Sequence, residues 1–464
     1  MKTNKIRGRE ARADAPGNLS GNKRRTGVEA VYGTVSVCPV CLKRVDAAIV
    51  GRDGGYFMEK TCDEHGFFST VVWRGDDPPF EGWGEIKSAA PDSRPALGCP
   101  GACGLCAGHL QKTCCALVEV THRCNLRCPV CFADSGVARV SARLSVETLY
   151  ARFRKLAAAG STFVQLSGGE PTTRDDLPEI VAAAKRAGCE YVQLNSNGIR
   201  LGAEPEYTRA LAEAGLDFVF MQFDGVRDDI YERLRGRPLF DIKRAAIDAC
   251  AEQYLGVTLV PTIAPGINDG DIGAILEFGF RRSPAVRGVH FQPISYFGRY
   301  PGAPGDGGRI TLPEIMRAID SQTGGKVKIS DLLPSACDHP RCGFHGDFAV
   351  LPNNTLLKLT KKGKAASSSC CDDAHLRNRK FVARRWKRAP AGAEEDTAVG
   401  ADDYRDMDGF LARVKSHGFT ITCMAFQDAY NLDLERLRRC SLHVFDGRRT
   451  VPFCARYITA RRMP

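Results

Sequence analysis

The sequence lacks several features that would assign it to common classes of protein. None of its apolar runs approaches the ~18 residues of a membrane-spanning helix. The N-terminus is basic and polar and contains no apolar segment typical of a secretory signal. There is no recognisable nucleic-acid-binding motif and no long internal repeat. We therefore expect a cytoplasmic protein that does not bind nucleic acid, with a disordered basic tail over residues 1–30.

Cysteine, in contrast, is abundant, with 20 in 464 residues. Disulfide-rich secreted proteins are usually much shorter than this chain. The cysteines also fall in clusters, which is typical of metal ligands. A chain of this length exceeds one compact core, so we expect several domains.

The charge balance is basic, because Lys+Arg exceed Asp+Glu by 65 − 54 = 11. Much of this excess lies in the N-terminal tail and in the segment from Arg377 to Arg388. We interpret both as solvated basic segments. Peripheral contact with an anionic membrane surface is the alternative.

A small metal-knuckle module and its linker are predicted over residues 31–95. Cys38 and Cys41 form one knuckle, and Cys62 and His65 form a second one after a hairpin-like segment. Three thiolates and one imidazole suit a tetrahedral site for Zn²⁺ or a rubredoxin-like mononuclear iron.

The most specific motif is Cys124, Cys128 and Cys131, spaced C-x3-C-x2-C. Three thiolates on so short a loop can hold three corners of a [4Fe–4S] cluster and leave the fourth iron open.

The same spacing occurs upstream at Cys99, Cys103 and Cys106, where Cys114 or Cys115 is available as a fourth ligand. We prefer Cys114 and predict a closed auxiliary [4Fe–4S] cluster over residues 96–115. A second zinc site would use the same residues.

Residues 116–310 alternate apolar, strand-like runs with amphipathic helices. Six such runs predict an α/β fold with a parallel sheet, here a partial (β/α)6 barrel. Active sites of such sheets lie at the carboxyl ends of the strands, and the Cys124 loop directly follows the first run.

Polar turns follow the next runs. They contain Gly168, Gly169 and Glu170, then Asn195, Ser196 and Asn197, and then Asp224. An open iron beside a glycine-rich turn that can receive an amino acid predicts bound S-adenosylmethionine (SAM). His290 and Gln292 end the sixth run as possible substrate groups.

A C-terminal domain is predicted over residues 311–464. We interpret Cys337, Cys342, Cys440 and Cys454 as ligands of a second closed auxiliary cluster. Cys370 and Cys371 have no assignment, and either could replace one of these ligands.

These motifs resemble those of the radical SAM superfamily. The resemblance implies that the cluster on Cys124, Cys128 and Cys131 reductively cleaves SAM, and that the resulting 5′-deoxyadenosyl radical abstracts hydrogen from an unactivated C–H. It also implies SAM contacts from the polar turns and an electron donor of the ferredoxin or flavodoxin type.

Further motifs resemble a narrower group, the archaeal tetraether-lipid synthases and their relatives first described as pterin-methylating enzymes. These motifs are CPVC…CDEHG, CPGACGLC, CDHPRC and PFCA, between Val31 and Arg456. The resemblance implies carbon–carbon bond formation on lipid alkyl chains, or alternatively methylation of a pterin-like small molecule. The first predicts a long apolar tunnel with a basic rim, and the second a compact polar pocket. A non-catalytic zinc-bearing scaffold is the alternative from another class.

Overall fold

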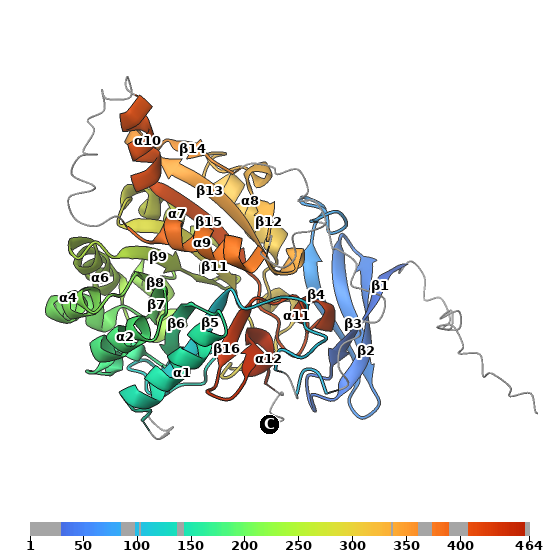
Figure 1. Cartoon of the computed structure of the whole chain (residues 1–464). Coiled ribbons are helices and arrows are strands. Elements are labelled where there is room, and N and C mark those ends of the chain that lie inside the picture. The colour runs from blue at the N-terminus through green and yellow to red at the C-terminus, as the bar shows by residue number, and fades with distance from the viewer. Residues whose placement is uncertain are drawn as a thin grey trace, which may run out of the picture.

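Two β-sheets organise the part of the chain that the structure describes (Figure 1). This computed structural model describes residues 29–84, 98–101, 104–136, 143–335, 337–360, 374–388 and 407–459. Cys103, Cys370 and Cys371 lie outside these ranges, as does most of the predicted tail. No helix among the described residues is long and apolar enough to cross a membrane.

The smaller sheet contains four antiparallel strands in chain order. They are β1 (Glu29–Val37), β2 (Arg44–Arg52), β3 (Gly55–Cys62) and β4 (Gly66–Arg74). Asp53 and Gly54 join β2 to β3 with φ of 50° and 69°, as a tight hairpin turn requires. Arg74 pairs with Glu314, and the buried Lys60 donates to the Ala429 carbonyl at 2.8 Å. These contacts fix the module against the rest of the protein.

The larger sheet contains the predicted parallel series and confirms the α/β fold. Its central strands are β5 (Cys115–Thr121), β6 (Phe163–Gly168), β7 (Tyr191–Ser196), β8 (Phe218–Gln222), β9 (Gly256–Val260) and β11 (Val286–Pro293). Adjacent strands in this series are parallel. Short β10 (Thr262–Ile263) pairs with β11.

Helices connect these strands, and their apolar faces are buried. They are α1 (Val146–Ala158), α2 (Leu177–Arg186), α3 (Ile199–Ala203), α4 (Pro205–Glu213), α5 (Asp228–Arg235), α6 (Phe240–Glu252), α7 (Ile272–Arg281) and α8 (Leu312–Gln322). Short 3-10 helices are η1 (Pro171–Thr173), η2 (Asp269–Asp271), η3 (Asp306–Gly308), η4 (Ile329–Asp331), η5 (Pro340–Cys342) and η6 (Pro352–Asn354). In α1, the predicted N-cap Ser145 accepts from the Thr148 N–H at 3.2 Å.

The C-terminal region extends this sheet at both edges rather than forming a sheet of its own. β15 (Gly418–Met424) lies parallel beside β11, and β16 (Leu442–Phe445) lies parallel beside β5. Antiparallel strands β12 (Leu333–Pro334), β13 (Gly343–Val350), β14 (Leu356–Lys358) and β17 (Thr450–Pro452) complete the edges. In the described residues no ladder joins β12 to β17, so the barrel is open.

The basic segment near residue 380 is a helix, so our expectation of a solvated loop is wrong there. This helix is α9 (Ala374–Trp386); α10 (Met407–Ser416), α11 (Leu434–Leu437) and α12 (Phe453–Tyr457) follow. Arg379 is buried and donates to the carbonyls of Thr113, Cys114 and Gly160 at 2.9 to 3.3 Å. The helix thus crosses the amino-terminal ends of β5 and β6. A run of charges does not reveal that one arginine faces inward to meet strand-end carbonyls.

We predict that Arg379→Met lowers the free energy of unfolding by about 2–4 kcal/mol, because several buried carbonyls lose their donor. The measurement is urea unfolding followed by circular dichroism. The matched control is Lys380→Met on the exposed face of the same helix, which we expect to change stability by less than about 0.5 kcal/mol. Equal losses in the two variants would contradict the buried position of Arg379.

Candidate functional site

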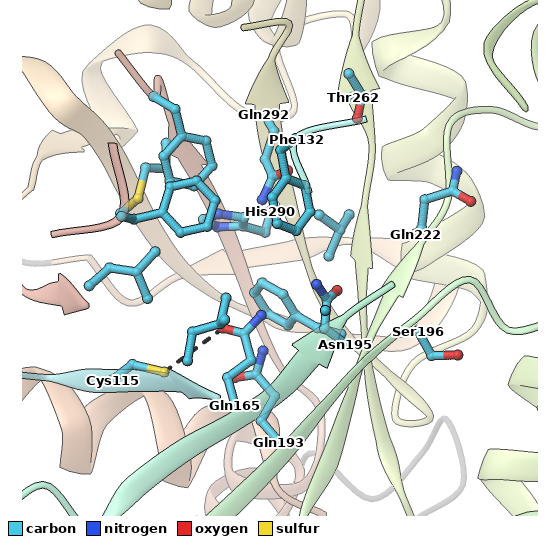
Figure 2. Close-up of a pocket in the computed structure, with 18 of the residues that line it drawn as sticks. Cys115, Phe132, Gln165, Gln193, Asn195, Ser196, Gln222, Thr262, His290 and Gln292 are labelled. Atoms are coloured by element: carbon cyan, nitrogen blue, oxygen red, sulfur yellow. Dashed lines mark hydrogen bonds between the residues drawn. The ribbon is translucent and has the colours of Figure 1, made fainter. Parts of the chain in front are cut away.

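A cavity of about 300 Å³, partly open to solvent, lies along the inner face of the larger sheet (Figure 2). One end is lined by the three cysteines of the C-x3-C-x2-C loop. Its middle is lined by side chains from the inner face of the parallel strands, and its other end by Cys114 and by Asn378 and Trp386 of α9. Both ends of the central strands therefore contribute to a single cavity.

The loop that carries Cys124, Cys128 and Cys131 follows β5 and is held from several sides. Cys131 and Arg299 exchange backbone hydrogen bonds of 2.9 and 3.0 Å. The Arg299 guanidinium also donates to the Cys128 carbonyl at 3.0 Å. Burial raises the pKa of the Cys124 thiol to about 12, so an iron ion must displace its proton before the sulfur can act as a ligand.

Gly168 and Gly169 bring the turn after β6 into direct backbone contact with this loop. The Gly169 N–H donates to the Thr121 carbonyl, and the Glu170 N–H to the Arg123 carbonyl, both at 2.8 Å. A Cβ at Gly168 would lie 2.1 Å from the Thr121 oxygen, and one at Gly169 the same distance from the Arg123 oxygen. Only glycine fits at these two positions.

Glu170 is buried, and its carboxylate accepts hydrogen bonds from the chain itself. The donors are the Asn197 N–H at 2.7 Å, the Ser196 hydroxyl at 2.8 Å, and both the N–H and hydroxyl of Thr172. Burial raises the pKa of the carboxyl, and these donors oppose the rise. Oε1 accepts three of these hydrogen bonds and Oε2 accepts one, so Glu170 joins the turns after β6 and β7 and Oε2 can accept a further donor. The predicted contact with the SAM ammonium stays a prediction.

The Asn195, Ser196 and Asn197 turn also reaches the cysteine loop. The Asn197 amide donates to Asn125, between Cys124 and Cys128, at 2.7 Å. The Asn195 amide donates to Ser167 at 3.2 Å and lines the cavity. The turn therefore supports the loop and contributes to the cavity wall.

Asp224 differs from expectation because it does not line the cavity. Its two oxygens accept from Arg235 at 2.7 Å each, and the guanidinium of Arg235 does line the cavity. Burial works against the charge on Arg235, but the Asp224 carboxylate offsets it and keeps the guanidinium pKa above its ordinary value. Asp224 thus holds the Arg235 guanidinium in place at the cavity wall.

Lys243 of α6 completes this support and was not identified from the sequence. It is buried, donates to the Asn197 carbonyl, and donates to the Gln222 side chain at 2.9 Å. Gln222 in turn donates to Asp224. Burial lowers the pKa of Lys243 to about 7. A lysine on an amphipathic helix carries no sequence signal for such a position.

The four ligands predicted in the N-terminal module come together. The ligating atoms of Cys38, Cys41, Cys62 and His65 all lie within 4.8 Å of one another. The Cys41 and Cys62 sulfurs are 3.9 Å apart, and the His65 Nδ1 is 3.5 and 3.6 Å from the Cys62 and Cys38 sulfurs. Sulfurs on one tetrahedral Zn²⁺ lie about 3.8 Å apart, so this set fits a mononuclear ion bound through Nδ1.

The remaining cysteines are grouped differently from our prediction. Cys114 lies within hydrogen-bonding reach of Cys337, which was expected to ligate the other cluster. Cys342, Cys440 and Cys454 remain electrostatic neighbours, and the buried Arg436 donates to the Cys342 sulfur at 3.6 Å. Cys99 is half-buried and Cys106 is exposed. The two auxiliary clusters and their ligand sets stay predictions, and the contact between Cys114 and Cys337 places one predicted ligand of each set side by side.

Two family models match this chain, and one relative matches it over nearly its whole length. The chain matches the radical SAM superfamily over residues 118–279 and the HMPTM N-terminal zinc ribbon domain over residues 31–74. It is 32% identical to 7,8-dihydro-6-hydroxymethylpterin dimethyltransferase of Methanocaldococcus jannaschii, covering 92% of this chain and 94% of the relative. This chain belongs to the radical SAM superfamily.

Two further similarities are partial. Fe-coproporphyrin III synthase of Methanosarcina barkeri is 33% identical over 44% of this chain and 49% of its own length. The FeFe-hydrogenase maturase structure from Carboxydothermus hydrogenoformans superposes with a TM-score of 0.38 at 12% identity, covering 46% of this chain and 52% of that chain.

As a radical SAM enzyme, the chain uses SAM and a [4Fe–4S] cluster, and the three thiols at one end of the cavity fit the ligand set of such a cluster. Three thiols converge on one end, with the open space beside them bordered by the glycine turn and Asn195. The cluster and SAM supply the 5′-deoxyadenosyl radical when bound. The chain's own residues position the loop and enclose the space.

We predict that Gly169→Ala lowers the iron and sulfide bound at the cysteine loop, because the added Cβ displaces the Arg123 backbone. The measurement is iron and sulfide content after anaerobic reconstitution, together with SAM cleavage. The control is Gly136→Ala in the same loop, where a Cβ meets nothing within 4 Å. Identical cluster content in both variants would show that the close contact is not required.

We predict that Cys41→Ala removes about one equivalent of Zn²⁺ or mononuclear iron, because three ligands remain of four. Elemental analysis should show this loss while sulfide content stays unchanged. Loss of sulfide instead would indicate that the module holds an iron–sulfur cluster.

Proposed function

We propose that this protein is a radical SAM methyltransferase that modifies a compact heterocycle of the pterin type. The carrying observation is the row of uncharged carboxamides along the cavity beyond the cysteine loop. They are Gln165, Gln193, Asn195, Gln222 and Gln292. The similarity to the pterin dimethyltransferase over nearly the whole chain supports the same conclusion.

The cavity is less suitable for a lipid tail, which was our first expectation. Its volume is near the lower limit for small-molecule pockets, about 300 Å³. An alkyl chain in this space would leave buried amides without partners, at about 1–3 kcal/mol for each. Arg235 is the one lysine or arginine among the described lining residues, and Asp224 already neutralises it.

The chain's residues would contribute position and enclosure to this reaction. The glycine turn, Asn125 and Arg299 fix the cysteine loop above the cavity. At the opposite end Trp386 is held by its indole N–H, which donates to Thr420 at 2.9 Å. A substrate between these two ends has protein on several sides, which limits the access of water to a radical.

Electron delivery and cell location belong to this proposal as well. We propose a ferredoxin or flavodoxin type of donor for the cluster, and a role of the auxiliary cysteines in electron relay. Peripheral membrane contact stays the alternative for the basic surface.

We predict that the anaerobically reconstituted protein, given a reductant, SAM as the radical source, and a second SAM or a folate as the methyl donor, forms 5′-deoxyadenosine and adds methyl groups to 6-hydroxymethyl-7,8-dihydropterin. Mass spectrometry should show gains of methyl mass in the pterin. Cys128→Ala should abolish both products, because two thiolates cannot hold the open-iron cluster. Cys250→Ala is the control, since this buried thiol lies in α6 and does not line the cavity.

Other outcomes would reject the proposal. An unchanged pterin, together with coupling of added phospholipids by loss of two hydrogens, would favour the lipid synthase. Full 5′-deoxyadenosine formation by Cys128→Ala would contradict the assignment of the cysteine loop.

A further inference from the structure

Two carboxamides lie side by side in the middle of the cavity. Gln165 of β6 and Gln193 of β7 are direct partners in the parallel register, so their side chains leave the same face at the same level. Both line the cavity, and Figure 2 shows them adjacent, across the cavity from His290. Their exposed fractions are only 9% and 2%.

Neither amide is satisfied by the protein. The Gln193 Nε2 has no hydrogen-bond partner, and the Gln165 Oε1 accepts only from the Cys115 thiol, at 3.9 Å. A thiol is a weak donor, and that distance is long. A buried amide without a partner costs about 1–3 kcal/mol, so a ligand that meets both groups recovers this cost on binding.

The surrounding wall is aromatic and uncharged. The centroid of the Phe220 ring lies 5.2 Å from that of the His290 ring and 4.8 Å from that of the Trp386 ring. The His290 Nδ1 contacts the Thr422 hydroxyl at 2.8 Å, and burial lowers the His290 pKa to about 4, so the imidazole is neutral. Such a wall suits a flat, neutral ring.

Charged groups of the cavity wall lie elsewhere. Glu170 and Arg235 border the cysteine-loop end, and Asp338 accepts from the Ser441 N–H at 2.7 Å near the start of β16. A phosphate or carboxylate placed at the level of the two glutamines would meet no cation from the strands that line it. The group recognised there is therefore neutral and polar.

We infer that Gln165 and Gln193 form a subsite that reads the cyclic amide edge of a heterocyclic substrate. The Gln193 Nε2 donates to the ring carbonyl oxygen, and the Gln165 Oε1 accepts from the adjacent ring N–H. This inference rests on the proposed function and deepens it, because it names the residues that select a 4-oxo ring. Side chains on neighbouring strands leave the sheet about 4.8 Å apart, so both carboxamides can turn toward one edge of the same ring.

The test reverses the roles of donor and acceptor, once by changing the ligand and once by changing Gln193. The ligands are 6-hydroxymethylpterin and 2,4-diamino-6-hydroxymethylpteridine, which differ in carrying a 4-oxo or a 4-amino group. Binding to the reconstituted protein is measured by equilibrium dialysis, which serves every ligand used. The wild-type protein should prefer the 4-oxo ligand.

In Gln193→Glu the donor becomes an acceptor-only carboxylate. We expect the affinity for the 4-oxo ligand to fall about tenfold or more, and the preference to move toward the 4-amino ligand. Gln193→Met offers neither a donor nor a carboxylate acceptor. This variant should bind the 4-oxo ligand more weakly, without a change of preference toward the 4-amino ligand.

Thr258→Val is the matched control. Thr258 is equally buried on β9, its hydroxyl also lacks a partner, and it does not line the cavity. This variant should bind both ligands like the wild-type protein. Iron and sulfide content of each variant reports whether it has folded.

The possible failures are distinguishable. If the wild-type protein methylates the pterin but Gln193→Glu keeps the wild-type preference, the subsite is wrong and the proposed function stands. If the wild-type protein binds neither pteridine but binds hypoxanthine, and Gln193→Met loses that binding, the subsite stands and the pterin assignment fails. No binding of any of the three ligands would overturn both.

Discussion

The backbone contact between the glycine turn and the cysteine loop is the constraint on which the site depends. Two hydrogen bonds of 2.8 Å hold Gly169 and Glu170 against Thr121 and Arg123. Because a Cβ at Gly168 or Gly169 would collide with a carbonyl oxygen, the loop can occupy this position only beside glycine. The cysteines are thus placed by the neighbouring strand as much as by their own.

From this contact a buried polar network continues around the rim of the sheet. Glu170 binds the turn after β7, Lys243 joins that turn to Gln222, and Gln222 joins Asp224 and Arg235. Buried ionic groups are costly unless every member is paired, and here each carboxylate has several donors. The network gives the carboxyl ends of three strands a fixed geometry around the cavity.

The C-terminal region extends the central series of strands and supplies part of the cavity wall. β15 and β16 extend the sheet at its two edges, and α9 covers strand ends far from the cysteine loop (Figure 1). Trp386 and Asn378 of this helix line the cavity. The region that we expected to be a separate domain therefore lines the same cavity as the central strands.

The sequence by itself determined the parallel series, the cysteine loop and the Cys38–His65 knuckle site. Each of these rests on local spacing or on the period of apolar residues, which the chain carries within a few residues. Gln165 and Gln193 were also visible as polar residues inside strands buried on both faces, although their meaning was not recognised. Strands buried on both faces are mainly apolar, so a glutamine within one of them indicates a polar partner or a site.

Only the tertiary structure decided which distant groups meet. Cys114 and Cys337 are more than two hundred residues apart, and nothing in their local spacing pairs them. The inward direction of Arg379, the burial of Lys243 and the in-register placement of the two glutamines likewise depend on how elements pack. The spacing of cysteines identifies a metal-ligand loop in the sequence. Only long-range packing sets which distant residues lie beside that loop and what shape the cavity has.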